Sequence, residues 1–257
     1  MDFIVERNDI AKMEVDAIVL PANPQLRIGP GASKAIFDNA GSKQLEKECA
    51  KRLNELKKAG VELAPGMSVV THAYNLSAQV IVHTIVPKWR GGDHGEYDEL
   101  CMAYLSALKV ADRMGLYSIA FPLLASGNMG FDIDVAVEVA MRSIEHFKPE
   151  NNLSEIYLVT YGDNATRKMR DLGFEVKEHV NQMDILDQKV AQAGMVSTAG
   201  RKQKKASPVF ENLFDDAIEW LKEPENCEKL IGAALSIMKF VTSLKSQESA
   251  KQQNSAD

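Results

Sequence analysis

Two glycine-bearing loops have the residue types needed to hold a phosphate group. The first, "PANPQLRIGPGAS", follows an apolar run that ends at Leu20, and the second, "LLASGNMGFD", follows another apolar run. Each loop leads into a helical pattern, and a helix N-terminus with free N–H groups favours an anion. The alternative is that the glycines only make tight turns, and it applies to Gly29, Gly31, Gly127 and Gly130. Spacing alone supports a phosphate-containing ligand and nothing narrower, since neither GxxxxGK[ST] nor GxGxxG occurs.

Other candidates for catalysis have simpler interpretations. His83 lies within an apolar run and is expected to be a core histidine, whereas His94 belongs to a charged, solvated loop. Asp132 and Asp134 stand where acidic side chains cap a helix. The three cysteines are far apart and show no CxxC or Cys/His spacing, so neither a metal site nor a disulfide framework is predicted. No cofactor is expected.

The order of the elements predicts how these loops are positioned. Short apolar runs predict strands at residues 3–5, 17–20, 67–74, 78–86, 119–124, 153–160 and 174–178. Helical spacing predicts helices at residues 32–40, 43–59, 97–114, 133–147 and 164–172. This alternation predicts a three-layer α/β/α sandwich with a mixed, mainly parallel central sheet. Both loops would then lie at the carboxyl ends of strands, where such sheets bind ligands.

The chain after this unit has a different character. Residues 1–180 are predicted to form one domain, and residues 181–207, which include the basic run "STAGRKQKKAS", a solvated linker. Residues 208–246 carry two amphipathic patterns that predict a C-terminal helical hairpin, and residues 247–257 are predicted to be a disordered tail. Two such helices cannot bury both faces alone. They are expected to dock on the main domain, on a second copy or on a protein partner.

Composition excludes several classes of protein. The 257 residues are 45% hydrophobic and 26% charged, with a formal net charge of −6, which argues against non-specific nucleic-acid binding. The N-terminus lacks the basic and apolar regions of a signal peptide, and no apolar stretch is long enough to span a bilayer. A cytoplasmic location without membrane attachment is expected.

Four segments, in order, resemble one family. They are "VDAIVLPAN", "LAPGMSVVTHAYNL", "VIVHTIVPKWRGG" and "IAFPLLASGNMGF". Together they are similar to the motifs of the macrodomain family, over about residues 1–180. The resemblance implies a protein that binds ADP-ribose, or ADP-ribosyl groups carried on proteins or small molecules.

The resemblance also implies roles for individual residues at the adenine end. Asp9 matches the acidic residue that takes the adenine amino group, helped by the amide of Ile10, and Tyr161 falls where an aromatic ring stacks on adenine. The alternatives are that Asp9 is a turn residue and that Tyr161 caps the edge of the core.

At the other end, the resemblance implies a diphosphate loop in which backbone N–H groups do most of the binding. Its residues are Ser126, Gly127, Asn128, Met129 and Gly130. Phe131 follows as a wall of the ribose side, and Asn23 matches the asparagine beside the distal ribose. Asn23 could instead fix the backbone of its own loop. It is also the one residue that we consider for catalysis.

The first loop departs from the hydrolytic members of the family. Leu20 replaces an asparagine, Ile28 and Pro30 fill two of four glycine positions around Gly29 and Gly31, and Ser33 replaces an acidic residue proposed to activate water. A hydroxyl is a poor general base near neutral pH. These changes favour ADP-ribose binding without efficient catalysis. Two alternatives stay open: a hydrolase that removes ADP-ribosyl groups or deacetylates O-acetyl-ADP-ribose, and a scaffold with a degenerate pocket that acts through its C-terminal helices.

Overall fold

The computed structural model describes residues 1–178. The predicted linker, helical hairpin and C-terminal tail lie outside the described residues, so they stay predictions. Among residues 1–178, no helix is long and apolar enough to span a membrane.

A single seven-stranded sheet forms the centre of the domain, in the order β3-β4-β2-β5-β6-β1-β7. Its strands are β1 (Asp2–Arg7), β2 (Ala17–Ala22), β3 (Ser68–His72), β4 (Val80–Ile85), β5 (Ser118–Pro122), β6 (Glu155–Thr160) and β7 (Val176–Glu178). The β3–β4 pair is antiparallel, and all other neighbouring strands are parallel. The prediction of a mixed, mainly parallel sheet is therefore confirmed.

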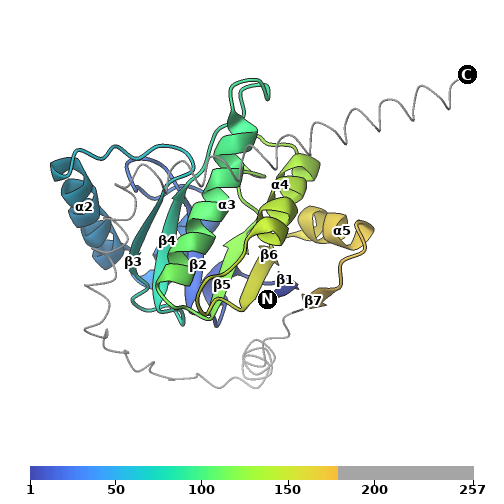
Figure 1. The fold of residues 1–257 in the computed structure, drawn as a ribbon. Helices are drawn as coiled ribbons and strands as arrows, with labels where there is room; N and C mark the ends of the chain where they lie inside the picture. Colours follow the sequence, from blue (N-terminus) through green and yellow to red (C-terminus); the bar gives the residue numbers. More distant parts are fainter. Residues whose placement is uncertain (179–257) are drawn as a thin grey trace, which may run out of the picture.

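Helices cover both faces of this sheet. They are α1 (Ala32–Ala40), α2 (Ser42–Lys58), α3 (Glu96–Arg113), α4 (Ile133–His146) and α5 (Asp163–Asp171), with a short 3-10 helix, η1 (Ile10–Lys12). Phe37 of α1 packs on His83 of β4, and Tyr104 of α3 packs on Phe121 of β5. The strand registers place His83 and Phe121 on opposite faces of the sheet, so α1 and α3 form separate layers. Figure 1 shows α3 and α4 side by side over one face, α2 beside β3, and α5 near β7.

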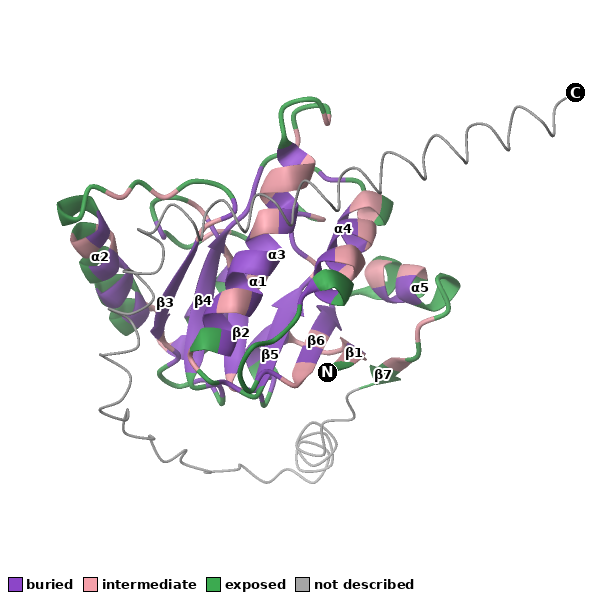
Figure 2. Ribbon diagram, in the orientation of Figure 1, coloured by how far each residue is buried: buried purple, intermediate pink, exposed green. Residues whose placement is uncertain are grey.

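The central strands are buried on both faces, which explains why they read as continuous apolar runs rather than alternating patterns. Every residue of β4 and β5 is buried, and so is nearly all of β2 (Figure 2). His83 lies in this core with no exposed surface, and its Nε2 lies 2.8 Å from the Thr71 hydroxyl. Burial lowers the pKa of His83 to about 4, so the ring is neutral near pH 7. The prediction of a core histidine is confirmed.

Candidate functional site

A groove runs along the carboxyl edge of β2, β5 and β6. It consists of two neighbouring compartments, a first of about 360 Å³ and a second of about 430 Å³. Residues that line both compartments are Gly31, Ala32, Pro122, Val159 and Tyr161. Because these residues are shared, the two compartments form one continuous groove, at the edge of the sheet where the sequence predicted a ligand.

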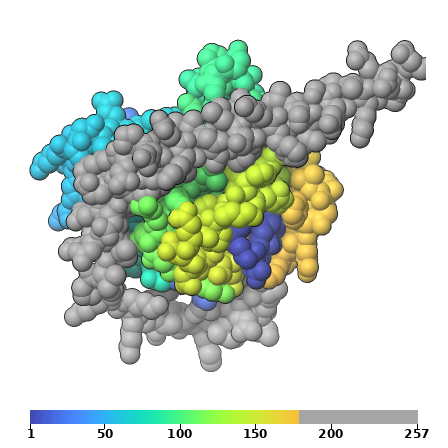
Figure 3. All heavy atoms as spheres, in the orientation of Figure 1, coloured from blue at the N-terminus to red at the C-terminus, as the bar shows by residue number. Residues whose placement is uncertain are grey.

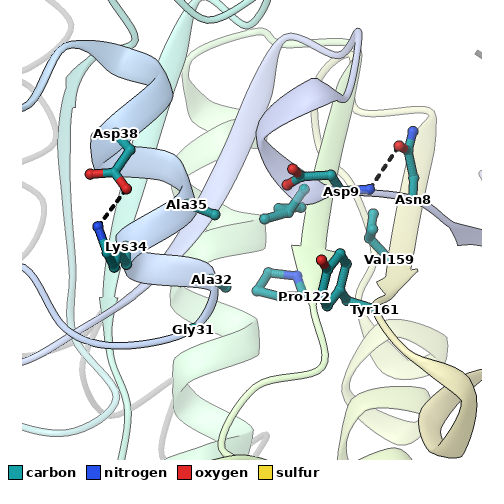
Figure 4. Close-up of a pocket in the computed structure, with 11 residues that line it drawn as sticks. Asn8, Asp9, Gly31, Ala32, Lys34, Ala35, Asp38, Pro122, Val159 and Tyr161 are labelled. Carbon is teal, nitrogen blue, oxygen red and sulfur yellow. Dashed lines mark hydrogen bonds and ion pairs between the residues drawn. The ribbon is translucent and has the colours of Figure 1, made fainter. Parts of the chain in front are cut away.

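The first compartment lies between η1, α1 and the ends of β5 and β6, and Asp9 points toward it (Figure 4). Asp9 caps η1, because its Oδ1 accepts a hydrogen bond from the amide of Ala11 at 3.0 Å. Among the described residues, no group donates to its second carboxylate oxygen. Asp9 therefore acts as a turn residue through one carboxylate oxygen, and the other oxygen can accept a further hydrogen bond. Ile10, which also lines this compartment, has its side chain in the core.

Tyr161 follows the last residue of β6 and lines both compartments. It is 83% exposed, so it does not cap the core, which was the alternative interpretation. In Figure 4 its ring lies next to Pro122 and Val159, on the side of the compartment opposite α1. An exposed ring beside apolar walls offers a platform on which a planar ring could stack.

The second compartment is lined on one side by the loop at residues 123–131, which we call the amide loop. Six of its members line the compartment: Leu123, Ala125, Ser126, Gly127, Asn128 and Met129. Two backbone hydrogen bonds close the loop, from Gly130 to the Gly127 carbonyl at 3.0 Å and from Phe131 to the Ala125 carbonyl at 3.3 Å. Within residues 1–178, the four amides at 126–129 have no acceptor, so they form a row of donors suited to an anion.

Gly130 and Phe131, which the resemblance placed beside the ligand, line neither compartment, and their roles in binding stay predictions. Gly130 turns the chain with a φ of +81°. Phe131 is 4% exposed and packs on Trp89, with 5.0 Å between ring centroids. A large aromatic side chain gains more from burial in this cluster than from forming a pocket wall. The neighbouring Met129 lines the second compartment.

The other side of the second compartment is the loop at residues 23–33, here the self-bonded loop. The Asn23 side chain accepts from the amides of Gln25 and Arg27, both at 3.1 Å, and donates to the Arg27 carbonyl at 2.8 Å. The Gly29 amide donates to Ser33 Oγ at 3.0 Å. Pro30 has no N–H. Among the described groups, the amides without an acceptor on this side are those of Asn23 and Ile28 and those at the start of α1.

Asn23 thus fixes the backbone of its own loop, as the alternative interpretation expected, while also lining the second compartment. Its catalytic role stays a prediction. Gly29 and Gly31 line the compartment as well.

Among the described residues, acidic and basic side chains line only the first compartment. Asp9, Lys34 and Asp38 line it, and Lys34 pairs with Asp38 at 2.6 Å. No Asp, Glu, His, Lys or Arg lines the second compartment within the described part of the chain. The second compartment can therefore donate hydrogen bonds to an anion but supplies no general base. No cluster of potential metal ligands occurs among residues 1–178.

The contribution of α1 to the first compartment was not predicted from the sequence. Ala32, Lys34, Ala35 and Asp38 all line it. Their spacing of three or four residues from Gly31 onward places them along one side of a helix, and this signal could have identified them.

The known proteins that this chain resembles are macrodomains and their relatives. The family model "Macro domain" matches residues 19–140. The O-acetyl-ADP-ribose deacetylase of Citrobacter rodentium (strain ICC168) is 40% identical over 164 residues, which cover 63% of this chain and 90% of the relative. Among solved structures, a mutant Oceanobacillus iheyensis macrodomain with ADPR superposes with a TM-score of 0.59 at 29% identity, over 65% of this chain and 91% of that one. A Trypanosoma brucei macrodomain in complex with ADP-ribose shares the fold, with a TM-score of 0.56 at 24% identity over 67% of this chain and 69% of the other.

Proposed function

Because the chain belongs to the macrodomain family, we propose that it binds ADP-ribose, free or attached to a target, in the groove at the carboxyl edge of its sheet. The observation that carries this proposal is the arrangement of the groove. A compartment with an exposed ring and a free carboxylate oxygen continues into one lined by a row of unpaired amides. Adenosine and a diphosphate need these two environments, side by side.

Each part of the ligand has a matching group. In the first compartment, adenine would stack on Tyr161, and its amino group would donate a hydrogen bond to the free oxygen of Asp9. The diphosphate would accept from the amides at residues 126–129 and from those at the start of α1, where the helix dipole also favours negative charge. The distal ribose would lie in the second compartment, near Asn23 and Met129.

We further propose that binding proceeds without efficient hydrolysis. Leu20 is 1% exposed, and its aliphatic side chain has neither a donor nor an acceptor. Ser33 is 3% exposed, and its hydroxyl already accepts from Gly29. Among residues 1–178, no acidic side chain or histidine lines the second compartment to take a proton from water there.

Deacetylation of O-acetyl-ADP-ribose is the second candidate, favoured by the names of the relatives. In that reaction water adds to the acetyl carbonyl, and the ester bond breaks to release acetate and ADP-ribose. We expect such a water to be aligned by the ligand's own phosphate and by Asn23. Loss of activity in Asn23→Ala with binding intact would support this route, and unchanged activity would exclude a role for Asn23.

Calorimetric titration of the full chain with ADP-ribose tests the proposal, with Gly127→Glu as the blocked variant. A Cβ at Gly127 meets no atom within 4 Å and Gly127 lines the second compartment, so we expect Gly127→Glu to fold and to place its carboxylate in that compartment. We expect binding by the native chain and its loss in the variant. Absence of binding by the native chain at millimolar ligand would contradict the proposal and favour the scaffold with a degenerate pocket. An acetate-release assay then separates a binder from a deacetylase.

A further inference from the structure

We propose that Glu96 is a positioning residue for the amide loop: it fixes the loop at residues 89–95, which in turn holds the Met129 carbonyl. The effect on ligand affinity rests on the proposed function. The effect on the conformation of the unliganded protein does not.

The carboxylate of Glu96 organises the loop that precedes α3. Glu96 is the first residue of α3 and has no exposed surface. It accepts hydrogen bonds from the amides of Arg90 at 2.7 Å, Gly92 at 3.2 Å and His94 at 2.7 Å. This loop projects from the body of the domain at the N-terminal end of α3 (Figures 1 and 3). The loop has no regular secondary structure, and three of its backbone amides are bonded instead to this one buried carboxylate.

Burial raises the pKa of Glu96, but the backbone N–H groups around it outweigh burial and hold the pKa at about 2. The carboxylate is therefore ionised at any pH near neutrality. All three bonds are charge-assisted, which makes them stronger than bonds between neutral groups.

The loop at residues 89–95 contacts the amide loop through Trp89. The Trp89 amide donates to the Met129 carbonyl at 2.8 Å. Its indole ring packs edge-on against Phe131 at 5.0 Å and Tyr97 at 5.4 Å between centroids. The backbone bond and the ring contact therefore hold the amide loop on both sides of Gly130.

The Met129 carbonyl is a sensitive point, because it belongs to the same peptide unit as the Gly130 amide. That amide closes the turn onto Gly127. If Trp89 shifts, the peptide unit can rotate and the row of amides at residues 126–129 loses its alignment. Donors held in place before the ligand arrives improve affinity, because less freedom is lost on binding.

The near-isosteric substitution Glu96→Gln tests this chain of contacts. It replaces one acceptor oxygen by an NH2 group that faces backbone N–H donors. We expect the dissociation constant for ADP-ribose to rise about tenfold. Adenosine, which fills only the first compartment, should bind as it does to the native chain in an NMR titration. Equal losses for adenosine and ADP-ribose would indicate general damage and overturn the proposal.

A second variant, Gly92→Ala, disturbs Trp89 directly rather than through Glu96. A Cβ at Gly92 would lie 2.7 Å from Trp89 Cη2, at a φ of +93°, so Gly92→Ala must displace the indole ring. We expect the same selective loss of ADP-ribose binding. This variant decides the proposal if Glu96→Gln does not fold. The matched control is Glu99→Gln, one turn along α3, where a half-exposed carboxylate meets Arg90 at 3.5 Å, and it should change neither affinity.

Hydrogen exchange of the unliganded full chain separates this proposal from the proposed function. In Glu96→Gln, the amides of Gly130 and Phe131 should exchange about tenfold faster. The amides of Ala11 and Lys12, beside the first compartment, should keep their native rates. Unchanged exchange at Gly130 would overturn the proposal even if the native chain binds ADP-ribose. Faster exchange there would support it even if no ADP-ribose binding is found.

Discussion

The two loops that line the second compartment use their backbone donors in opposite ways. In the self-bonded loop at residues 23–33, the amides of Gln25 and Arg27 donate to the Asn23 side chain, and the amide of Gly29 donates to Ser33 Oγ. The amide loop at residues 123–131 is closed by two backbone bonds and by a bond from Ser126 Oγ to the Leu123 carbonyl, and it leaves the amides at residues 126–129 unpaired. Both loops contain glycines and both precede a helix, so their sequences look alike while their capacity to bind an anion differs. A glycine-rich loop is therefore a candidate site only when its donors are left over after the loop has folded.

The largest expected difference comes from placing the same charge on each loop. Gly127→Glu should weaken ADP-ribose binding by about a hundredfold or more, because the carboxylate faces the row of free amides. Pro30→Glu adds a carboxylate at an exposed position on the opposite wall and should cost less than about tenfold. Calorimetry on both variants checks the pair. Equal losses would show that the two loops bind the anion equally.

The wall shared by the two compartments should show an intermediate effect. Tyr161→Ala removes an 83% exposed ring and is expected to weaken ADP-ribose binding about tenfold without lowering the thermal midpoint. Tyr161→Phe keeps the ring and should bind like the native chain. A stability loss in Tyr161→Ala would mean that the ring supports the fold after all.

Ser33→Ala sharpens the comparison by releasing a donor in the self-bonded loop. The hydroxyl that accepts from Gly29 is buried, so its loss should lower the free energy of unfolding by about 1 kcal/mol. Affinity for ADP-ribose should not fall, since the freed amide belongs to a residue that lines the compartment. Urea unfolding with and without ligand measures both quantities. Weaker binding in Ser33→Ala would show that the serine itself contacts the ligand.

The smallest effects are expected from pH. Since no acidic or basic side chain lines the second compartment in the described chain, we expect little change in affinity between pH 6 and 8. Stability should change, because the pKa of the buried His83 is lowered to about 4. The unfolded chain then binds more protons than the folded one between about pH 6.5 and 4, so the free energy of unfolding falls as pH falls through that window. From pH 8 to 6 the loss should be about 1 kcal/mol.

A His83→Gln variant, compared by urea unfolding at both pH values, provides the control. Its stability should lose this dependence on pH. A persistent dependence would assign the titration to another group.

Most of the fold could be predicted from periodicity. The helix predicted at residues 32–40 has those bounds, because its apolar spacing is regular and glycines flank it. Strand ends were less predictable: β1 runs from Asp2 to Arg7 rather than over residues 3–5, since it pairs with β6 and with β7. Backbone pairing holds the charged ends of β1 in the strand, and the spacing of hydrophobic residues does not reveal such pairing.

The candidate site could be predicted in outline only. Glycine spacing and family resemblance identified the amide loop, and residues 126–129 do line the groove. They could not separate these positions from Gly130 and Phe131, because that depends on Trp89, a residue far away in sequence. Nor could they show that Asn23 bonds to its own loop, since three side-chain bonds of this kind require the folded turn.

The row of unpaired amides has a consequence for evolution and engineering. Every residue except proline carries the same main-chain donor, so a site built from amides tolerates substitution at Asn128 and Met129, whereas the Ser126 hydroxyl bonds to the Leu123 carbonyl and helps to shape the loop. Recognition of the anion is in this way uncoupled from the side chains beside it. A library randomised at Asn128 and Met129 is therefore expected to change what the groove accepts beyond the diphosphate while leaving the amide donors in place.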